Sequence, residues 1–386
     1  MNKICIIGGC GHVGIPLGLA FAGKGFEVVL LDISQKSVDL INSKKLPFLE
    51  EGAEELLEKH SGKNLFATTD CNVVKDAEIV VFVTGTPVDE HHNPKIKEVL
   101  NVVKQYLPYM NENQLVILRS TIYPNCTEIV DNLLKEKFGK SKLAFCPERI
   151  LQGRGIEEIY NLPQIVSATS EGALLEAKKL FSKIAPKVIC LDVKEAELAK
   201  LMTNAWRYLE FAIANQFYMM TEKEGLDFYK IYNAMRDDYP RAQHFARAGL
   251  AAGPCLFKDT MQLSAFSKNQ FFLGQSAMLV NEGLPNFLVS CLEQKMKTLK
   301  NKKIALLGLS FKPDNDDTRE SLSFKIIKEL EFKLAHVIVS DVYDKNTIDY
   351  KTALKEADGV ILGVPHKEYL SIKPEIPFVD CYNVWR

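Results

Sequence analysis

The chain has 386 residues, of which 47% are hydrophobic, and its 48 Lys and Arg nearly balance its 49 Asp and Glu. A chain of this length buries a large core and divides into two or three domains. The even charge excludes a protein that coats nucleic acid or an anionic membrane surface, because both need a basic excess. Since no apolar run is long enough to span a membrane, we expect neither a nucleic-acid nor a membrane partner.

Cysteine usage points to a reducing compartment. Nine cysteines are scattered along the sequence without a CxxC pair or a framework spacing. Dispersed cysteines in odd number are typical of reduced thiols, so we expect a cytoplasmic protein. The opening residues MNKICIIGG are broken by glycines too early for a signal peptide. The seven histidines lack the spacing of metal ligands, and no metal site is predicted.

Short apolar runs alternate with longer helical patterns in the N-terminal part of the chain. The runs are KICIIG, EVVLLD, EIVVFVTG, QLVILRST and LAFCPE. Near-continuous apolar strands that alternate with helices indicate a parallel sheet covered on both faces. We therefore predict an α/β fold that opens with a doubly wound, Rossmann-like lobe over residues 1–192.

The first strand is followed by a G-x-G-x-x-G turn. It runs from Gly9 to Gly14 and includes Gly11, His12 and Val13. The glycines allow a tight turn, a close approach of backbone N–H groups to a pyrophosphate, and close packing of helix on strand. Asp32 ends the second strand, where a carboxylate accepts hydrogen bonds from ribose hydroxyls and repels a 2′-phosphate. These features predict an NAD site, and a purely structural turn is the alternative.

Two later strand ends carry small polar residues. VTGTPVD includes Thr86 and Pro87, and LRSTIYP includes Ser120 and Thr121. Each segment fits the nicotinamide half of the cofactor. Each also fits an ordinary turn with proline at its corner.

From about Val193 the pattern changes to a long run rich in Ala, Leu, Met and Glu that contains no proline. This run predicts one long helix, apolar on more than one side and therefore buried between domains. Lys200 and Asn204 share a face of it, because they are i, i+4 neighbours. A buried lysine needs an anionic partner or a function, whereas an exposed one needs neither. Sequence patterns typical of helices continue to Leu299, and they predict a central helical segment over 193–299.

Cys255 follows the Gly/Ala/Pro run RAGLAAGP and precedes Lys258 and Asp259, while Glu148 ends a predicted strand in FCPER. A thiol adds to an aldehyde, an amine and an amide stabilise a developing alkoxide, and a carboxylate relays a proton. Cys255 alone fits equally well a small buried core residue.

The alternation of strands and helices returns after LKNKK. The new apolar runs are KKIALLGLSFK, AHVIVSD, DGVILGV and PFVDCY. We predict a second Rossmann-like parallel-sheet lobe over residues 300–386, joined to the first by the long helix and the helical middle. Ligands of such sheets bind at the carboxyl ends of the strands.

A series of motifs along the whole chain matches one family in order and spacing. The motifs are GCGHVG, TGTPVD, STIYP, CPER, AELAKLMTNAW, GPCLFKDT and GLSFKPDNDDTRES. By them the chain resembles the UDP-glucose/GDP-mannose dehydrogenase family. The resemblance implies an NAD-dependent, four-electron oxidation of the C6 hydroxyl of a nucleotide sugar to the uronic acid, for surface polysaccharide precursors. It also implies a homodimer formed through the long helix and a C-terminal lobe that binds the nucleotide half of the substrate.

The resemblance implies roles for particular residues. The implied catalytic residues are the nucleophile Cys255 with Lys200, Asn204, Asp259, Glu148 and Thr121. The implied cofactor contacts beyond the glycine turn are Asp32, Thr86, Pro87, Ser120, Thr121, Lys258 and Arg319. The implied substrate contacts are Glu148, Arg149, Gln152, Lys200, Asn204, Arg241, Gly249, Gly253, Phe311 and Lys312. Among these, Arg241 resembles an arginine that reaches the substrate of a neighbouring subunit.

Three positions depart from the family pattern. Ala252 replaces a glycine beside the sugar, Gln152 stands where the glucose enzymes usually carry a glutamate, and Tyr382 stands where many members show a substrate-binding arginine. CPER is more similar to members that act on N-acetylated aminosugars, so UDP-glucose and a UDP-N-acetylhexosamine both stay open. Two other functions remain as alternatives. The first is a two-electron 3-hydroxyacid-type dehydrogenase, which would need neither Cys255 nor a second lobe. The second is a non-catalytic sensor of NAD or of a nucleotide sugar, which would not need a thiol, a lysine and an acid in combination.

Overall fold

A computed structural model of the chain describes residues 3–85, 88–89 and 94–385. The chain divides into two compact units, Met1–Met202 and Thr203–Arg386. The boundary falls inside one long helix, α8 (Val193–Lys223). The division into three segments at residues 192 and 299 stays a prediction.

The first unit is built on an eight-stranded sheet with the order β3-β2-β1-β4-β5-β6-β7-β8. The strands are β1 (Lys3–Ile7), β2 (Glu27–Leu31), β3 (Leu65–Thr68), β4 (Ile79–Phe82), β5 (Leu115–Leu118), β6 (Leu143–Phe145), β7 (Gln164–Ala168) and β8 (Val188–Cys190). Neighbouring strands pair in parallel except β6 and β7, which are antiparallel. The predicted doubly wound parallel sheet is therefore confirmed, with an antiparallel edge of the kind common on large α/β sheets.

Helices cover both faces of this sheet, because successive side chains of a strand point to opposite sides. Ile4 and Ile6 of β1 belong to one apolar cluster, and Cys5 and Ile7 belong to another. The first face is covered by α1 (Gly14–Gly23), α2 (Gln35–Asn42), α3 (Ala53–His60), α6 (Gly155–Asn161) and α7 (Glu171–Phe181). The second face is covered by η1 (Cys71–Asp76), α4 (Ile96–Tyr106), η2 (Leu107–Tyr109) and α5 (Cys126–Phe138).

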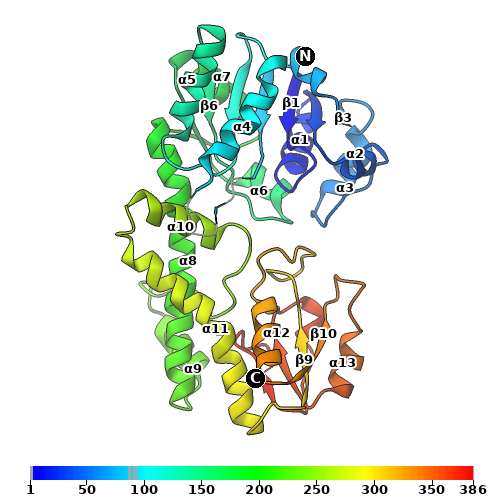
Figure 1. The fold of residues 1–386 in the computed structure, drawn as a ribbon, viewed down its shortest axis with the longest axis vertical. Helices are drawn as coiled ribbons and strands as arrows, with labels where there is room; N and C mark the ends of the chain where they lie inside the picture. The colour runs from blue at the N-terminus through cyan, green and yellow to red at the C-terminus, as the bar shows by residue number, and fades with distance from the viewer. Residues whose placement is uncertain (1–2, 86–87, 90–93, 386) are drawn as a thin grey trace. The chain divides into compact units, whose positions relative to one another are not determined.

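The second unit contains a four-stranded parallel sheet with the order β10-β9-β11-β12. Its strands are β9 (Lys303–Leu307), β10 (His336–Ser340), β11 (Gly359–Leu362) and β12 (Phe378–Val379). One face packs on α11 (Phe272–Met296) and α12 (Ser323–Phe332), which lie side by side in Figure 1, and the other packs on α13 (Tyr350–Glu356). The unit also contains α9 (Phe228–Arg236), α10 (Leu256–Phe266) and η3 (Lys367–Tyr369). The second Rossmann-like lobe is thus confirmed.

Helix α8 is the long helix that the sequence predicts from Val193. Its face with Lys200 and Asn204 is buried, but Trp206 is 59% exposed and Met220 is 57% exposed. The expectation that the whole helix is buried is therefore wrong for one face of α8. Large apolar side chains at helical spacing lie on that face, and they are Trp206, Ile213, Phe217 and Met220.

Candidate functional site

The turn between β1 and α1 leaves no room for side chains at two of its glycines. A methyl group on Gly9 would lie 2.6 Å from the carbonyl oxygen of Ile6, and one on Gly14 would overlap the backbone of Gly9. At Gly11, by contrast, such a methyl group would lie 3.6 Å from the oxygen of Gly8, which is an ordinary contact, so the protein itself leaves room there. Because Gly11 has no side chain, a ligand can approach its backbone closely. Since the turn precedes the N-terminus of α1, it favours an anionic group such as the pyrophosphate of NAD.

Asp32 directly follows β2 and is tied to the glycine turn. One carboxylate oxygen accepts the N–H of Cys10 at 3.0 Å, and the other accepts the N–H of Ser34 at 3.0 Å. An ionised carboxylate has about four acceptor positions, so these two bonds leave capacity for ribose hydroxyls. Its negative charge disfavours a 2′-phosphate, and the position therefore fits NAD better than NADP.

Other residues expected at the cofactor lie in the glycine turn, follow the carboxyl ends of strands, or lie outside the described residues. The ring of His12 stacks on that of Phe48, with centroids 3.7 Å apart. Ser120 lines a small hollow together with Thr84, which follows β4. Thr121 is the residue directly after Ser120. Thr86 and Pro87 belong to the residues that the structure does not describe.

Glu148 is held by a buried arginine that the sequence analysis did not single out. The guanidinium of Arg119, which is 1% exposed, pairs with one Glu148 oxygen and donates to the carbonyl of Cys146 at 3.1 Å. The other Glu148 oxygen accepts the N–H of Arg149 at 2.7 Å and that of Ile150 at 3.0 Å. These partners are the residue that directly follows β5 and two residues of the segment after β6. They fix the position of the Glu148 carboxylate within the first unit.

Arg149 and Gln152 lie in the same segment between β6 and α6. The guanidinium of Arg149 donates to the carbonyl of Pro163, and burial lowers the pKa of Arg149. Gln152 is partly buried. Arg149 and Gln152 are thus close in sequence to the anchored Glu148.

Cys255 occupies the N-cap position of α10, and its side chain is exposed. The partial positive charge of a helix N-terminus favours the anionic form of a thiol at this place. One turn further on, Asp259 is fully buried. Its Oδ2 accepts the amide N–H of Asn204 at 2.6 Å, and its Oδ1 lies 3.6 Å from Nζ of Lys258. The structure therefore brings together Asn204, Lys258 and Asp259, and it places Cys255 one helical turn from Asp259.

Lys200 precedes Asn204 by one turn of α8 and is 8% exposed. This burial excludes the solvent-exposed lysine that the sequence left open. The two side chains project from the same face of α8 because they are i, i+4 neighbours. An amine and an amide on one face are groups that stabilise an oxygen on which negative charge develops.

The end of the loop before Cys255 packs against the segment that follows β9. Gly253 has a φ of +99°, in the region that favours glycine, and its N–H donates to the carbonyl of Glu320 at 3.0 Å. A methyl group on Gly253 would lie 2.5 Å from the ring of Phe311. The Arg319 guanidinium donates three bonds to Asp317, and this hydrogen bonding raises the pKa of Arg319. The loop before Cys255 and the segment after β9 thus pack directly against each other.

The last two implied substrate residues are Lys312 and Arg241. Lys312 follows Phe311 in the segment after β9 and is partly buried. Arg241 is exposed, and its guanidinium donates to the Tyr239 hydroxyl at 2.7 Å and lies 4.6 Å from the centre of that ring. Its role at a neighbouring subunit stays a prediction.

Sequence reasoning missed several buried polar residues that organise these segments. Asn215 on α8 bonds both backbone groups of Gly249. Asp341 follows β10 as Asp32 follows β2, and it accepts the N–H of Ser310 at 3.1 Å and lies 3.2 Å from Nε2 of the buried His366. The repeat of VVLLD in VIVSD was the signal for Asp341, and an asparagine within an apolar helix was the signal for Asn215.

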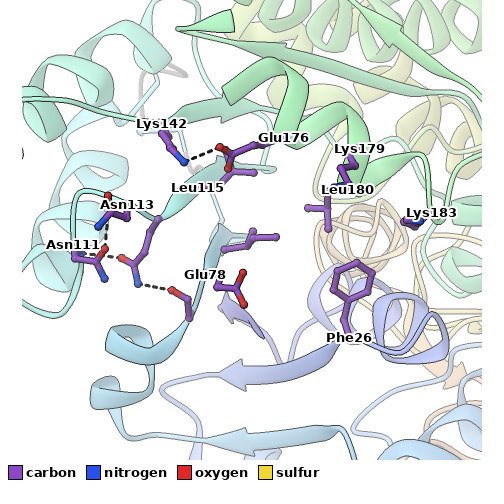
Figure 2. A pocket seen from close by; sticks show the side chains of 13 residues that line it. Phe26, Glu78, Asn111, Asn113, Leu115, Lys142, Glu176, Lys179, Leu180 and Lys183 are labelled. Carbon is purple, nitrogen blue, oxygen red and sulfur yellow. Dashed lines mark hydrogen bonds and ion pairs between the residues drawn. The ribbon is translucent and has the colours of Figure 1, made fainter. Parts of the chain in front are cut away.

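A separate cavity of about 600 Å³ lies in the first unit at the amino ends of β4 and β5 (Figure 2). Ile79 and Leu115, which begin these strands, line it together with Phe26, and Lys142 pairs with Glu176 at 2.6 Å on its wall. The glycine turn follows the carboxyl end of β1, which runs parallel to β4. The cavity is therefore at the opposite edge of the sheet from the turn and is not the cofactor site.

Two further properties concern the described part of the chain. Among residues 3–85, 88–89 and 94–385, no group of three or more His, Cys, Asp or Glu side chains is arranged to hold a metal ion. Within those same ranges, no helix combines the length and the apolar character needed to cross a membrane.

Three domain models of the UDP-glucose/GDP-mannose dehydrogenase family match the chain in sequence order. The NAD binding domain matches residues 2–185, the central domain matches residues 194–282, and the UDP binding domain matches residues 305–386. The first match contains the glycine turn and Asp32, the second contains nearly all of α8 together with Cys255, and the third contains most of the four-stranded sheet.

Related proteins are similar to this chain over nearly their whole length. A UDP-N-acetyl-D-mannosamine dehydrogenase of Campylobacter jejuni is 28% identical over 97% of this chain and 98% of its own. The UDP-glucose 6-dehydrogenase AglM of Haloferax volcanii is 28% identical over 95% of this chain and 92% of its own. The solved UDP-D-ManNAc dehydrogenase of Pyrococcus horikoshii is 27% identical and superposes with a TM-score of 0.89 over 96% of this chain and 91% of that one.

Proposed function

The chain belongs to the UDP-glucose/GDP-mannose dehydrogenase family and is an NAD-dependent nucleotide-sugar dehydrogenase, and on that premise we propose that it oxidises the C6 alcohol of a UDP-linked sugar to the carboxylate through Cys255. One observation carries this proposal. Cys255 is an exposed thiol at the N-terminus of α10, one turn from a buried Asp259 that is bonded to Asn204.

The glycine turn and Asp32 are the groups that we propose to hold the cofactor. NAD, when bound, accepts one hydride in each of two oxidations, so that one alcohol and one water give a carboxylate, two NADH and three protons. The backbone of the turn at Gly11 would hold the pyrophosphate, and Asp32 would accept hydrogen bonds from the ribose. The further contacts that we propose are Thr86, Pro87, Ser120, Thr121, Lys258 and Arg319.

In the first oxidation the C6 hydroxyl loses its proton as C6 loses a hydride, and an aldehyde forms. We assign Lys200 and Asn204 to the C6 oxygen, because a buried amine and amide stabilise the negative charge that develops there. Asp259 holds the Asn204 amide by their 2.6 Å hydrogen bond and so orients it. Asp259 is therefore a positioning residue for Asn204 in this step.

In the second oxidation Cys255 makes the aldehyde carbon tetrahedral. Its thiolate forms a C–S bond to C6, and the carbonyl oxygen becomes an alkoxide that Lys200 and Asn204 stabilise. An aldehyde is a poor hydride donor, whereas this tetrahedral adduct releases a hydride readily and becomes a thioester. The exposed position of Cys255 at the start of α10 supports this role, since the helix N-terminus favours the thiolate that attacks.

Hydrolysis of the thioester completes the reaction. A water oxygen bonds to the thioester carbon, the C–S bond breaks, and Cys255 recovers its thiol. We assign to Glu148 the removal of the water proton and to Thr121 the ordering of that water. The support for Glu148 is its fixed carboxylate, which Arg119 and two backbone N–H groups hold in place.

We propose an N-acetylated hexosamine as the sugar, ahead of glucose. The name of the Campylobacter jejuni relative and the motif CPER support it, while the name of the Haloferax volcanii relative supports glucose. The product then serves as a precursor of a surface polysaccharide, made in the cytoplasm. The test is a panel of UDP-glucose, UDP-N-acetylmannosamine and UDP-N-acetylglucosamine with NAD, comparing kcat/KM. An N-acetylated substrate is expected to lead by at least about tenfold, and a lead of UDP-glucose would contradict the choice.

We also propose that two copies associate through α8. The support is the apolar face of this helix, where Trp206 is 59% exposed and Ile213, Phe217 and Met220 follow at helical spacing. An apolar stripe of this kind on a single chain marks an interaction surface, because it gains free energy when it leaves water. The family resemblance to homodimers selects a second copy as the partner.

A further inference from the structure

The loop that leads to Cys255 is held from one side by α8. Asn215 of α8 is fully buried, and its Oδ1 accepts the N–H of Gly249 at 2.9 Å while its Nδ2 donates to the Gly249 carbonyl at 3.0 Å. The same Nδ2 donates to Oδ1 of the buried Asn281 at 2.9 Å. Both backbone groups of Gly249 are therefore fixed by one side chain, whose own position is set by α11.

The same loop is held from the other side by Tyr382. A methyl group on Gly249 would lie 2.7 Å from Cε1 of Tyr382, so the aromatic ring fills the space beside this glycine. The Tyr382 hydroxyl accepts the N–H of Leu250 at 3.3 Å and donates to the carbonyl of Gly363 at 2.7 Å. One phenol thus connects the loop before Cys255 with the residue that directly follows β11.

The position of Tyr382 is itself fixed by its neighbours. Its N–H donates to Asp380 at 2.8 Å, and its carbonyl accepts from the guanidinium of Arg247 at 2.8 Å. Arg247 lies over the ring of Tyr229 at 4.8 Å, and the Tyr229 hydroxyl donates to the carbonyl of Cys381 at 2.6 Å. Burial raises the pKa of Tyr382 well above its usual range, so the phenol keeps the proton that it donates to Gly363.

Gly363 lies at the edge of the second sheet where a ligand binds in folds of this class. β11 pairs in parallel with β9, with Leu362 opposite Leu307, so the segments after both strands leave the sheet at one edge. Ligands of open α/β sheets bind at this carboxyl edge. The segment after β9 contains Phe311, which packs on Gly253 two residues before Cys255.

We propose that Tyr382 is a positioning residue that transmits occupation of the nucleotide site in the second sheet to the loop carrying Cys255. The inference rests on the proposed function, because it takes UDP as the group bound at that sheet. A ligand that immobilises the backbone at Gly363 also immobilises the phenol bonded to it, and through Leu250 and Gly249 the loop. Binding of the nucleotide half of the substrate then restricts the motion of the Cys255 thiol before the sugar reacts.

The test is the rate at which iodoacetamide alkylates Cys255, with and without UDP. In this reaction the thiolate sulfur bonds to carbon and iodide leaves, and peptide mapping by mass spectrometry separates Cys255 from the other exposed cysteine, Cys190. In the unmodified chain we expect saturating UDP to slow alkylation about three- to tenfold, the range that one hydrogen bond supplies. In Tyr382→Phe we expect faster alkylation without UDP and less than about a twofold effect of UDP.

Two controls make the outcomes decisive. Tyr350→Phe removes a phenol oxygen elsewhere in the same unit, where Tyr350 packs on Tyr369, and should keep the full UDP effect. Calorimetric titration of UDP into each variant shows whether UDP binds. If UDP binds but leaves alkylation of the unmodified chain unchanged, or if Tyr382→Phe keeps the full effect, the inference is wrong and the proposed function stands. If UDP does not bind the unmodified chain, the proposed substrate class and the inference both fail.

Discussion

The side-chain amide of Asn204 donates a hydrogen bond of 2.6 Å to the carboxylate of Asp259, and both residues are buried. Asn204 belongs to α8 and Asp259 to α10, so the bond joins the helix that contains Lys200 to the helix that begins after Cys255. The second oxygen of Asp259 is 3.6 Å from the ammonium group of Lys258. A buried carboxylate depends on such donors, since it has lost its water.

Replacing Asn204 by alanine removes the shorter of these two contacts. We expect the free energy of unfolding to fall by about 1–3 kcal/mol, because the Asp259 carboxylate stays buried without its amide donor. We expect kcat to fall about a hundredfold, because the amide also stabilises the C6 oxygen. Urea unfolding and steady-state kinetics measure the two effects.

The control is Asn233→Ala, which removes an exposed amide on α9. It should change the free energy of unfolding by less than about 0.5 kcal/mol. If the two alanine variants unfolded at the same urea concentration, the bond between Asn204 and Asp259 would not contribute to stability.

The ion pair between Arg119 and Glu148 predicts a non-additive effect on stability. Arg119→Met leaves the Glu148 carboxylate largely buried without its cation, so we expect a loss of about 3–5 kcal/mol. Adding Glu148→Gln removes the uncompensated charge and should restore part of this loss. The measurement is the urea midpoint of each variant. A double variant that is no more stable than Arg119→Met would show that the two side chains do not depend on each other.

The exposed face of α8 predicts that a charge at its centre weakens self-association. Trp206→Glu places a carboxylate where an apolar ring leaves water on association, and we expect monomers at concentrations at which the unmodified chain is dimeric. Sedimentation velocity measures the shift. Phe332→Glu is the matched control, because Phe332 is 79% exposed on α12, and it should leave the dimer intact. An unmodified chain that sediments as a monomer would contradict the proposal.

Much of the fold was predictable from the sequence because local sequence patterns specify its strands, turns and helices. The strand KICII, the glycine turn after it and Asp32 at the end of EVVLL follow one another in a single βαβ unit, and each leaves a local signal. The antiparallel β7 was missed, because QIVSA has the composition of a strand but nothing in its sequence gives its direction. Strand direction depends on the connection through α6, which is a tertiary property.

The candidate site was predictable where residue type and spacing determine chemistry. Cys255, Lys258 and Asp259 lie within two turns of each other in the sequence, and the structure keeps Lys258 beside Asp259. Arg119 escaped notice because its partner Glu148 is remote in sequence and an arginine after an apolar strand resembles any surface cation. The exposure of Trp206 was also missed, since an apolar residue on a helix does not reveal whether its own chain or another copy covers it.

Cys255→Ser tests the thiol as the nucleophile. A serine oxygen forms an analogous adduct, but it is less available as an anion near neutral pH and its ester is hydrolysed more slowly than a thioester. We expect slow turnover with a covalent intermediate that adds to the mass of the intact chain. Cys190→Ser, which changes an exposed thiol at the end of β8, should react at the parental rate. If Cys255→Ser also turned over at the parental rate, the Cys255 thiol would not be the nucleophile.

The number of NADH molecules formed for each nucleotide sugar consumed tests the central claim most directly. Complete conversion of a limiting amount of the preferred UDP-sugar, with the product identified by mass spectrometry, gives this ratio. Two oxidations through the Cys255 adduct predict two NADH for each sugar, with the uronic acid as the product and no free aldehyde. A ratio near one with accumulating aldehyde would contradict it and would identify a two-electron dehydrogenase instead.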